Sequence, residues 1–183
     1  PEAVARIFQE KERPSFDPLI VHISDIAQLY KLSRSVSSVV LRLAEHFWPG
    51  PLTIIFPRQP HIPDAATGGL DTVALRCPDH KIAHAFLQAA GVPVAGPSAN
   101  LSGRPSPTTA EEVAHDMNGR VDMIIDGGPC HIGVESTIVE CNVDDTVTIL
   151  RPGAITLEML RKIISNVLID TNLVTGKGIP KAP

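Results

Sequence analysis

The sequence predicts an α/β fold, a twisted mixed sheet with flanking helices. Short apolar runs rich in β-branched residues alternate with longer stretches whose apolar residues recur at helical spacing. Two late runs, 136–141 and 146–150, follow each other with no helical stretch between them. Because these two strands are adjacent in sequence, we expect a mixed sheet rather than a strictly parallel one.

The composition limits what the chain can be. Its 183 residues suffice for one domain with a sizeable core, and 43% hydrophobic with 20% charged residues is ordinary for a globular protein. The net charge of −4 disfavours a broad nucleic-acid or membrane surface, so an anion site must be local. No apolar run reaches the roughly 20 residues of a membrane span. Three cysteines without CxxC spacing predict a reducing cytoplasm and no protein-bound metal.

Each element of the first half has a local signal. Val4, Ile7 and Phe8 share one face of an amphipathic helix. A loop is predicted for residues 57–71, which contain several prolines and glycines. The run 19–23 is nearly all apolar and predicts a strand buried on both faces. The predicted strands are 19–23, 52–56 and 72–76. The predicted helices are 2–10, 25–32 capped by Asp25, 35–47 capped by Ser35, and 79–90 closed by Gly91.

The second half begins with a short run at 92–95, predicted as a buried strand, and a stiff loop of small residues and prolines at 96–107. Thr109 and Glu112 form a capping box for a helix ending near Gly119. The remaining predicted strands are 123–125, 136–141 and 146–150. Thr156 caps a helix predicted to run to about residue 166. Residues 1–169 are therefore expected to form one domain, and 170–183 a linker or tail.

Cations and hydroxyls gather in the turns. Lys11 with Arg13, Arg76 at a strand end, and Arg151 before a Pro-Gly turn each suit either a ligand clamp or a buried ion pair. The loop at 96–107 suits either a ligand site at a strand end or a proline-rich surface turn. No nucleophile–base pair or carboxylate dyad is evident. Cations without a nucleophile favour binding of a nucleoside triphosphate, with chemistry by positioning and charge neutralisation.

Several motifs occur together and in order over nearly the whole chain. They are Lys11-x-Arg13-Pro14, 18–22 (PLIVH), 48–53 (WPGPLT), 74–78 (ALRCP), 97–103 (PSANLSG), 135–137 (EST) and 151–153 (RPG). Together they resemble the YrdC family of threonylcarbamoyl-AMP synthases. The resemblance implies a sheet around a positively charged cavity. It also implies an enzyme, a nucleotidyltransferase that joins threonine, bicarbonate and ATP into threonylcarbamoyl-AMP and pyrophosphate for tRNA modification.

The resemblance also implies roles for residues. Lys11 and Arg13 are expected to contact the triphosphate and support catalysis. The expected ATP contacts are Lys11, Arg13, Asp17, Thr72, Ser98, Asn100, Ser106 and Arg151. The expected threonine contacts are His22, Arg76, Gly96 and Ser136. ATP is expected as substrate, with Mg²⁺ held mainly by its phosphates. The implied partner is a downstream tRNA threonylcarbamoyl transferase, and weak contact with tRNA would fit this role.

The chain departs from the family pattern in two ways. A threonine-binding segment of the form PTETVYGL normally precedes the KxRP loop and is absent here. Glu12 and Asp17 stand where the family usually has Gly and Asn, adding negative charge beside the triphosphate site. We therefore expect the chain as given to be weakly active or inactive. Its last residues resemble the start of a linker to a second domain.

Two other functions fit parts of the pattern. One is a related carbamoyl-adenylating domain of hydrogenase-maturation type, which usually lies in a longer chain with zinc-finger-like cysteines. The other is a non-catalytic RNA-binding module with the same fold, against which the net charge of −4 argues. A binder driven by phosphate contacts would show a steep salt dependence with tRNA.

Overall fold

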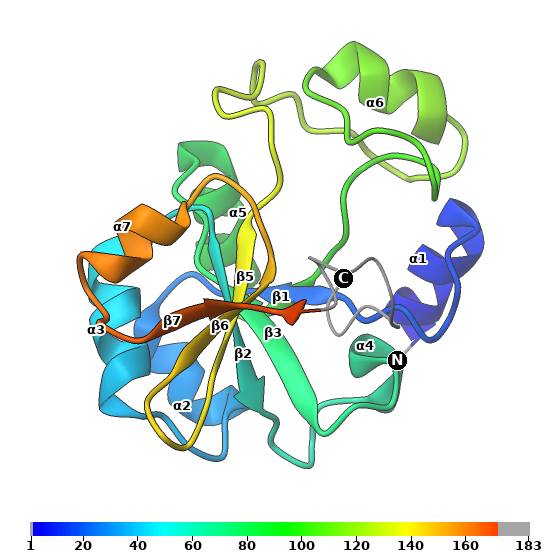
Figure 1. Ribbon diagram of the computed structural model, residues 1–183. Coiled ribbons are helices and arrows are strands. Elements are labelled where there is room, and N and C mark those ends of the chain that lie inside the picture. The colour runs from blue at the N-terminus through cyan, green and yellow to red at the C-terminus, as the bar shows by residue number, and fades with distance from the viewer. Residues whose placement is uncertain (1, 172–183) are drawn as a thin grey trace.

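A computed structural model describes residues 2–171, which form a seven-stranded mixed sheet with helices on both sides (Figure 1). The strands are β1 (Ile20–His22), β2 (Leu52–Pro57), β3 (Thr72–Arg76), β4 (Val94–Ala95), β5 (Thr137–Cys141), β6 (Val147–Arg151) and β7 (Val167–Ile169). The α-helices are α1 (Glu2–Lys11), α2 (Leu29–Leu32), α3 (Ser38–Phe47), α4 (Asp64–Thr67), α5 (Lys81–Ala90), α6 (Ala110–Met117) and α7 (Leu157–Arg161).

The sheet has the order β4-β1-β3-β2-β5-β6-β7 and mixes both kinds of pairing. The β1–β3, β2–β5 and β6–β7 pairs are parallel, whereas β4–β1, β3–β2 and β5–β6 are antiparallel. The predicted mixed sheet is therefore confirmed. Because directions alternate in this way, the carboxyl ends of β1, β3 and β6 meet the amino ends of β2 and β5 at one edge.

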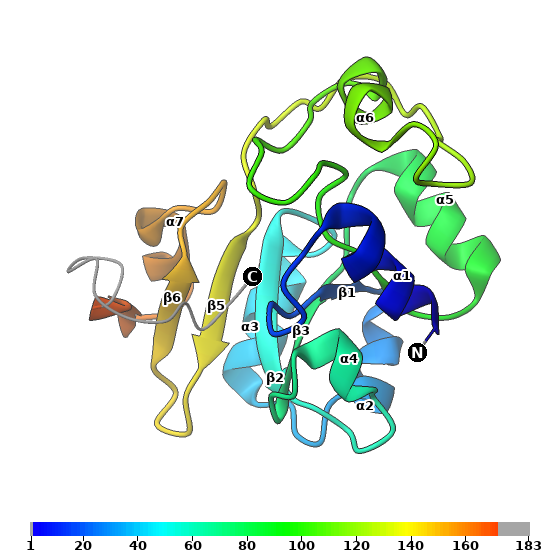
Figure 2. The same cartoon turned by 90° about the vertical axis from the view of Figure 1, so that its right-hand side faces the viewer.

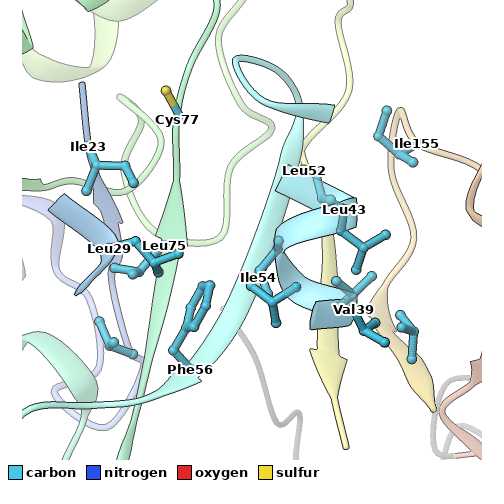
Figure 3. Close-up of a cluster of buried hydrophobic side chains, with 14 of the residues drawn as sticks. Ile23, Leu29, Val39, Leu43, Leu52, Ile54, Phe56, Leu75, Cys77 and Ile155 are labelled. Atoms are coloured by element: carbon cyan, nitrogen blue, oxygen red, sulfur yellow. The ribbon is translucent and has the colours of Figure 1, made fainter. Parts of the chain in front are cut away.

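The core lies on one side of this sheet. Alternate side chains of the central strands, including Val21, Ile54 and Leu75, point to that side and pack against α2 and α3 (Figure 3). In Figure 1, α2, α3 and α7 lie on this side, and α1 and α4 lie on the other. The run 19–23 was predicted to be buried on both faces, and this is wrong. Ile20 and His22 are only half-buried because they point to the second, polar side.

Most of the predicted helix caps occur in the structure, but several helices differ from their predicted extents. Asp25 accepts a hydrogen bond from the Ala27 N–H, yet the predicted helix 25–32 is a 3-10 turn (Ile26–Gln28) followed by α2. The cap of α3 is Ser37 rather than Ser35. The predicted loop 57–71 contains α4, which was missed. The capping box of α6 and the caps at Gly91 and Thr156 are confirmed.

Three strand predictions need correction. The run 92–95 contributes only Val94–Ala95, and this pair is half-buried because β4 is the end strand of the sheet. Residues 123–125 form no strand, since no described backbone pairs with them, and Met123 is 76% exposed. The helix after Thr156 ends at Arg161, and β7 replaces its predicted last part. The predicted tail lies outside the described residues from 172 onward.

In the part of the chain from 2 to 171, no helix is both long enough and apolar enough to span a bilayer.

Candidate functional site

The polar side of the sheet carries a row of residues at the shared strand edge. His22 at the end of β1 is paired in register with Arg76 at the end of β3. The Arg76 Nε donates to the Gly50 carbonyl at 3.1 Å. The terminal guanidinium nitrogens of Arg76 have no hydrogen-bond or ion-pair partner among the described residues. This leaves a planar two-donor fork available for an oxyanion.

His22 is neutral near pH 7 in this setting. Burial and the adjacent Arg76 lower its pKa to about 4, although a hydrogen bond with the Val94 backbone raises it. A neutral imidazole can donate from one nitrogen and accept at the other. His22 can therefore hydrogen-bond a polar ligand beside Arg76 without adding a second positive charge.

Ser136 and Arg151 form the neighbouring part of the site. Ser136 lies directly before β5, and its Oγ is 2.8 Å from the Thr53 Oγ1 of β2. The Arg151 Nη2 donates to both the carbonyl and the hydroxyl oxygen of Ser136, each at 3.0 Å. Thr53 belongs to this cluster and was missed, since a threonine inside an apolar strand gives no signal of its own.

The loop after α1 contributes Arg13 and Asp17. The Arg13 Nη2 lies 2.9 Å from the Asp17 Oδ2 and donates to the Pro18 carbonyl at 3.0 Å. Thr72 lies close to this loop, because register places Ala74 beside Ile20. Asp17 and Thr72 were expected as ATP contacts, and this role stays a prediction, with Thr72 at the first position of β3 and Arg76 at its last. Asp17 nevertheless pairs with the cation that was expected to face the phosphates.

Three arginines from separate parts of the chain influence one another here. Burial lowers the pKa of Arg151, Glu135 raises it, and the neighbouring cations Arg76 and Arg13 lower it further. Burial likewise lowers the pKa values of Arg13 and Arg76. Such mutual repulsion in a half-buried setting is relieved by a bound anion. The arrangement is suited to a ligand with several negative charges.

Lys11 has a different environment from the one expected. It is only 4% exposed, and its Nζ donates to the backbone carbonyls of Ser98 and Asn100. An ammonium has three donors, so one remains for a ligand. Lys11 thus joins α1 to the loop 96–107 in addition to any contact with a nucleotide.

The loop residues are partly brought to the site. Asn100 is 5% exposed, and its Oδ1 has no hydrogen-bond partner among residues 2–171, so this acceptor can take a donor from a ligand. Ser106 donates to the Glu135 Oε1 at 2.8 Å, placing it beside the Ser136 segment. Gly96 donates its N–H to the Ile20 carbonyl at 3.0 Å, on the β1 side of the loop. Ser98 is exposed, and only its carbonyl is engaged by Lys11.

An apolar groove of about 810 Å³ adjoins this loop and the open edge of β4. Side chains from several segments line it, including Ile7, Phe86, Val94, Met117 and Ile125. Figure 2 shows α1 and α4 in front of the sheet, with α6 and its flanking segments above α1 in this view. Exposed apolar side chains next to an unpaired strand edge are typical of a surface that another segment covers.

Comparison with known families decides what the chain is related to. The profile of the Sua5/YciO/YrdC family, described as "Telomere recombination", matches residues 1–153. The chain belongs to the Sua5/YciO/YrdC family. Both the predicted resemblance and the predicted fold are thereby confirmed.

Longer members of the Sua5/YciO/YrdC family match the chain most fully. A threonylcarbamoyl-AMP synthase of Bacillus subtilis is 48% identical over 183 residues, covering 100% of this chain and 53% of that protein. One of Pyrococcus abyssi is 46% identical over 98% of this chain and 52% of its own length. A crystal structure of P. abyssi Sua5 complexed with L-threonine superposes with a TM-score of 0.94 at 45% identity, covering 100% of this chain and 54% of that one. The chain thus spans about half the length of these relatives.

No group of three or more His, Cys, Asp or Glu residues within 2–171 is placed to hold a metal ion. The three cysteines are unpaired in the structure. The expected absence of a protein-bound metal stays a prediction.

Proposed function

We propose that the chain is the nucleotide- and threonine-binding part of an L-threonylcarbamoyladenylate synthase. The observation that carries the proposal is that Arg76 beside His22 and Arg151 beside Ser136 lie at the same edge of the sheet. Arg13 is near enough to lower the pKa of Arg151. A triphosphate and an amino acid carboxylate together supply negative charge that can balance the positive charge of these arginines. The names of the relatives at 46% and 48% identity favour this activity over a carbamoyl-adenylating domain of another type.

The residues divide into two subsites under this proposal. Arg76 would hold the carboxylate of threonine in its open fork, and neutral His22 and Ser136 would bond its polar groups, with Gly96 close by. Arg13, Arg151 and the third donor of Lys11 would face the phosphates. The further proposed ATP contacts are Asp17, Thr72, Ser98, Asn100 and Ser106.

The proposed reaction needs positioning rather than a protein nucleophile. The threonine amine attacks the carbon of bicarbonate or carbon dioxide and yields a carbamate, with water leaving when bicarbonate is used. A carbamate oxygen then attacks the α-phosphorus of ATP, and pyrophosphate leaves. Cations that already face the phosphates stabilise the charge on the leaving group without reorganising during the reaction.

Mg²⁺ fits this site as a companion of ATP. Asp17 and Glu135 are two of the carboxylates near the arginine cluster, and both are engaged, with Arg13 and Ser106 respectively. The ion would therefore take most of its ligands from phosphate oxygens, where it neutralises charge. A tRNA threonylcarbamoyl transferase that consumes the product is the proposed partner, with weak contact to tRNA, in the cytoplasm.

We further propose that residues 1–169 form a domain and that its apolar groove can receive an extended segment joined ahead of Pro1. The open edge of β4 offers unpaired backbone groups, and the groove offers apolar contacts. Such a segment would lie beside His22 and complete one wall of the threonine subsite, because β4 pairs with β1 at His22.

Replacing Arg13 or Asn100 with Ala should weaken ATP binding by about 1–3 kcal/mol, the cost of losing a hydrogen bond to a charged group or leaving one unmade. Isothermal titration calorimetry of the chain with ATP measures this directly. Lys31→Ala, at an exposed position of α2, serves as the matched control and should bind ATP normally. If both Arg13→Ala and Asn100→Ala bind ATP with unchanged affinity, the proposed ATP site is wrong.

ATP affinity should fall as the pH rises above about 8. Burial and the neighbouring Arg13 lower the pKa of Lys11 to about 8, while Asp116 raises it. Deprotonation of Lys11 removes a positive charge and a hydrogen-bond donor. Because bound phosphate favours protonated Lys11, the affinity for ATP can fall by up to about tenfold per pH unit. Lys11→Arg keeps its charge and should lack this step. A flat affinity between about pH 7.5 and 9.5 in the unsubstituted chain would contradict the role of Lys11.

A further inference from the structure

The peptide group joining Asn100 to Leu101 is held at both ends by side chains of opposite charge. Its carbonyl oxygen accepts a hydrogen bond from the buried Lys11 Nζ. Its N–H donates to the Asp116 Oδ2 at 3.2 Å. Lys11 ends α1 and Asp116 lies in α6, so two separate helices hold one peptide plane of the loop. Rotation of that plane would break both charge-assisted hydrogen bonds together.

This arrangement also fixes the Asn100 side chain. Its Nδ2 donates to the carbonyls of Leu101 and Arg104 at 2.9 and 2.8 Å, so both of its donors are used. The remaining polar atom, Oδ1, is buried and has no partner within the described residues. Because phosphate oxygens only accept hydrogen bonds, the group that meets Oδ1 must be a donor such as a hydroxyl or an amine.

We propose that Asp116 is a positioning residue which, together with Lys11, orients Asn100 so that its Oδ1 accepts a hydrogen bond from the nucleoside part of ATP. The inference rests on the proposed ATP site. It assigns Asn100 to a ribose hydroxyl or the adenine amine rather than to the phosphates. Asp116 acts through the Leu101 N–H and does not touch the ligand.

The test compares two ligands that share phosphates but differ in the nucleoside. Calorimetry would measure binding of ATP and of inorganic tripolyphosphate to the chain and its Asp116→Ala variant. Loss of the clamp should weaken ATP binding by about tenfold, as losing a hydrogen bond involving a charged group does. Asp116 raises the pKa of Lys11, so both ligands are compared at about pH 6, where Lys11 stays protonated with or without Asp116. Tripolyphosphate binding should then stay within about twofold, since Asp116 itself does not face the phosphates. Amide hydrogen exchange of Leu101 in the ligand-free chain should become faster.

Two further variants separate the clamp from general damage. Asp116→Asn keeps an acceptor for the Leu101 N–H and should restore most of the ATP affinity. Arg104→Ala removes the half-exposed ion pair with Asp116 but spares the Leu101 bond, so it should bind ATP normally. If Asp116→Ala does not fold, Asp116→Ser replaces it, because a serine side chain is too short to reach the same N–H.

If Asp116→Ala weakens the binding of ATP and of tripolyphosphate equally, the proposal is overturned. It is also overturned if the ATP affinity of Asp116→Ala stays within about twofold of that of the unsubstituted chain. Unchanged exchange of the Leu101 amide would overturn it too. If the unsubstituted chain binds neither ligand, the proposed function fails instead. The orientation of Asn100 by Asp116 is then decided by Leu101 exchange alone.

Discussion

Adding a PTETVYGL-type segment before Pro1 should raise threonine-dependent pyrophosphate release by about a hundredfold or more, because small misplacements at a reacting centre cost rate on that scale. In the structure, β4 ends the sheet with an open edge, and the groove beside it is lined by apolar side chains. A segment paired with β4 would fill this groove. It would also fix the threonine amine relative to His22 and Arg76, which the structure already holds side by side.

Pyrophosphate release with threonine, bicarbonate and ATP measures this effect. An extension of identical composition but scrambled order is the matched control and should not restore turnover. ATP affinity should differ little between the chain and its extended form, since the arginine cluster and the 96–107 loop are already in place. Equal, robust rates from both forms would show that the added segment is dispensable.

Gly153→Ala should destabilise the chain by about 3 kcal/mol, the upper part of the usual range for overpacking. A Cβ at this position would lie 2.4 Å from the Glu135 carbonyl oxygen and 2.6 Å from the Thr137 nitrogen. These backbone atoms flank Ser136 just before and at the start of β5, so they cannot move without shifting Ser136 and its hydrogen bonds with Arg151. Stability and ligand binding should therefore fall together.

Urea unfolding monitored by circular dichroism measures the loss of stability. Gly96→Ala is the matched control, because a Cβ there meets nothing within 4 Å and the glycine does not adopt a left-handed conformation. It should change the free energy of unfolding by less than about 0.5 kcal/mol. If Gly153→Ala has the same free energy of unfolding as Gly96→Ala, the backbone at 135–137 shifts at little cost and the prediction is wrong.

Features that depend on neighbouring residues were predicted well. The capping box of Thr109 and Glu112 and the C-cap at Gly91 rest on contacts within a few residues, so the sequence contains the whole signal. The strand at 72–76 was also predicted correctly, since its β-branched content and its flanking turns agree. The mixed sheet was predicted from two late strands that are adjacent in sequence, and these strands pair antiparallel as β5 and β6.

Features that depend on distant partners were not predicted. The run 123–125 has the composition of a strand, but a strand also needs a partner backbone, and none among the described residues pairs with it. The opposite error occurred at β7, where three residues form a strand because β6 lies alongside them. The site shows the same limit. The sequence placed Asn100 in a loop, but it ended the first helix before Lys11, which is the last residue of α1. The link between these two residues and Asp116 appears only when α1 and α6 come together.

This chain, we propose, binds ATP and threonine for one adenylation reaction. The most direct measurement is pyrophosphate release by the extended form, with mass spectrometry of the product. We predict release only when threonine, bicarbonate and ATP are all present, with threonylcarbamoyl-AMP as the product. Release that is independent of threonine, or that requires carbamoyl phosphate instead, would contradict the claim.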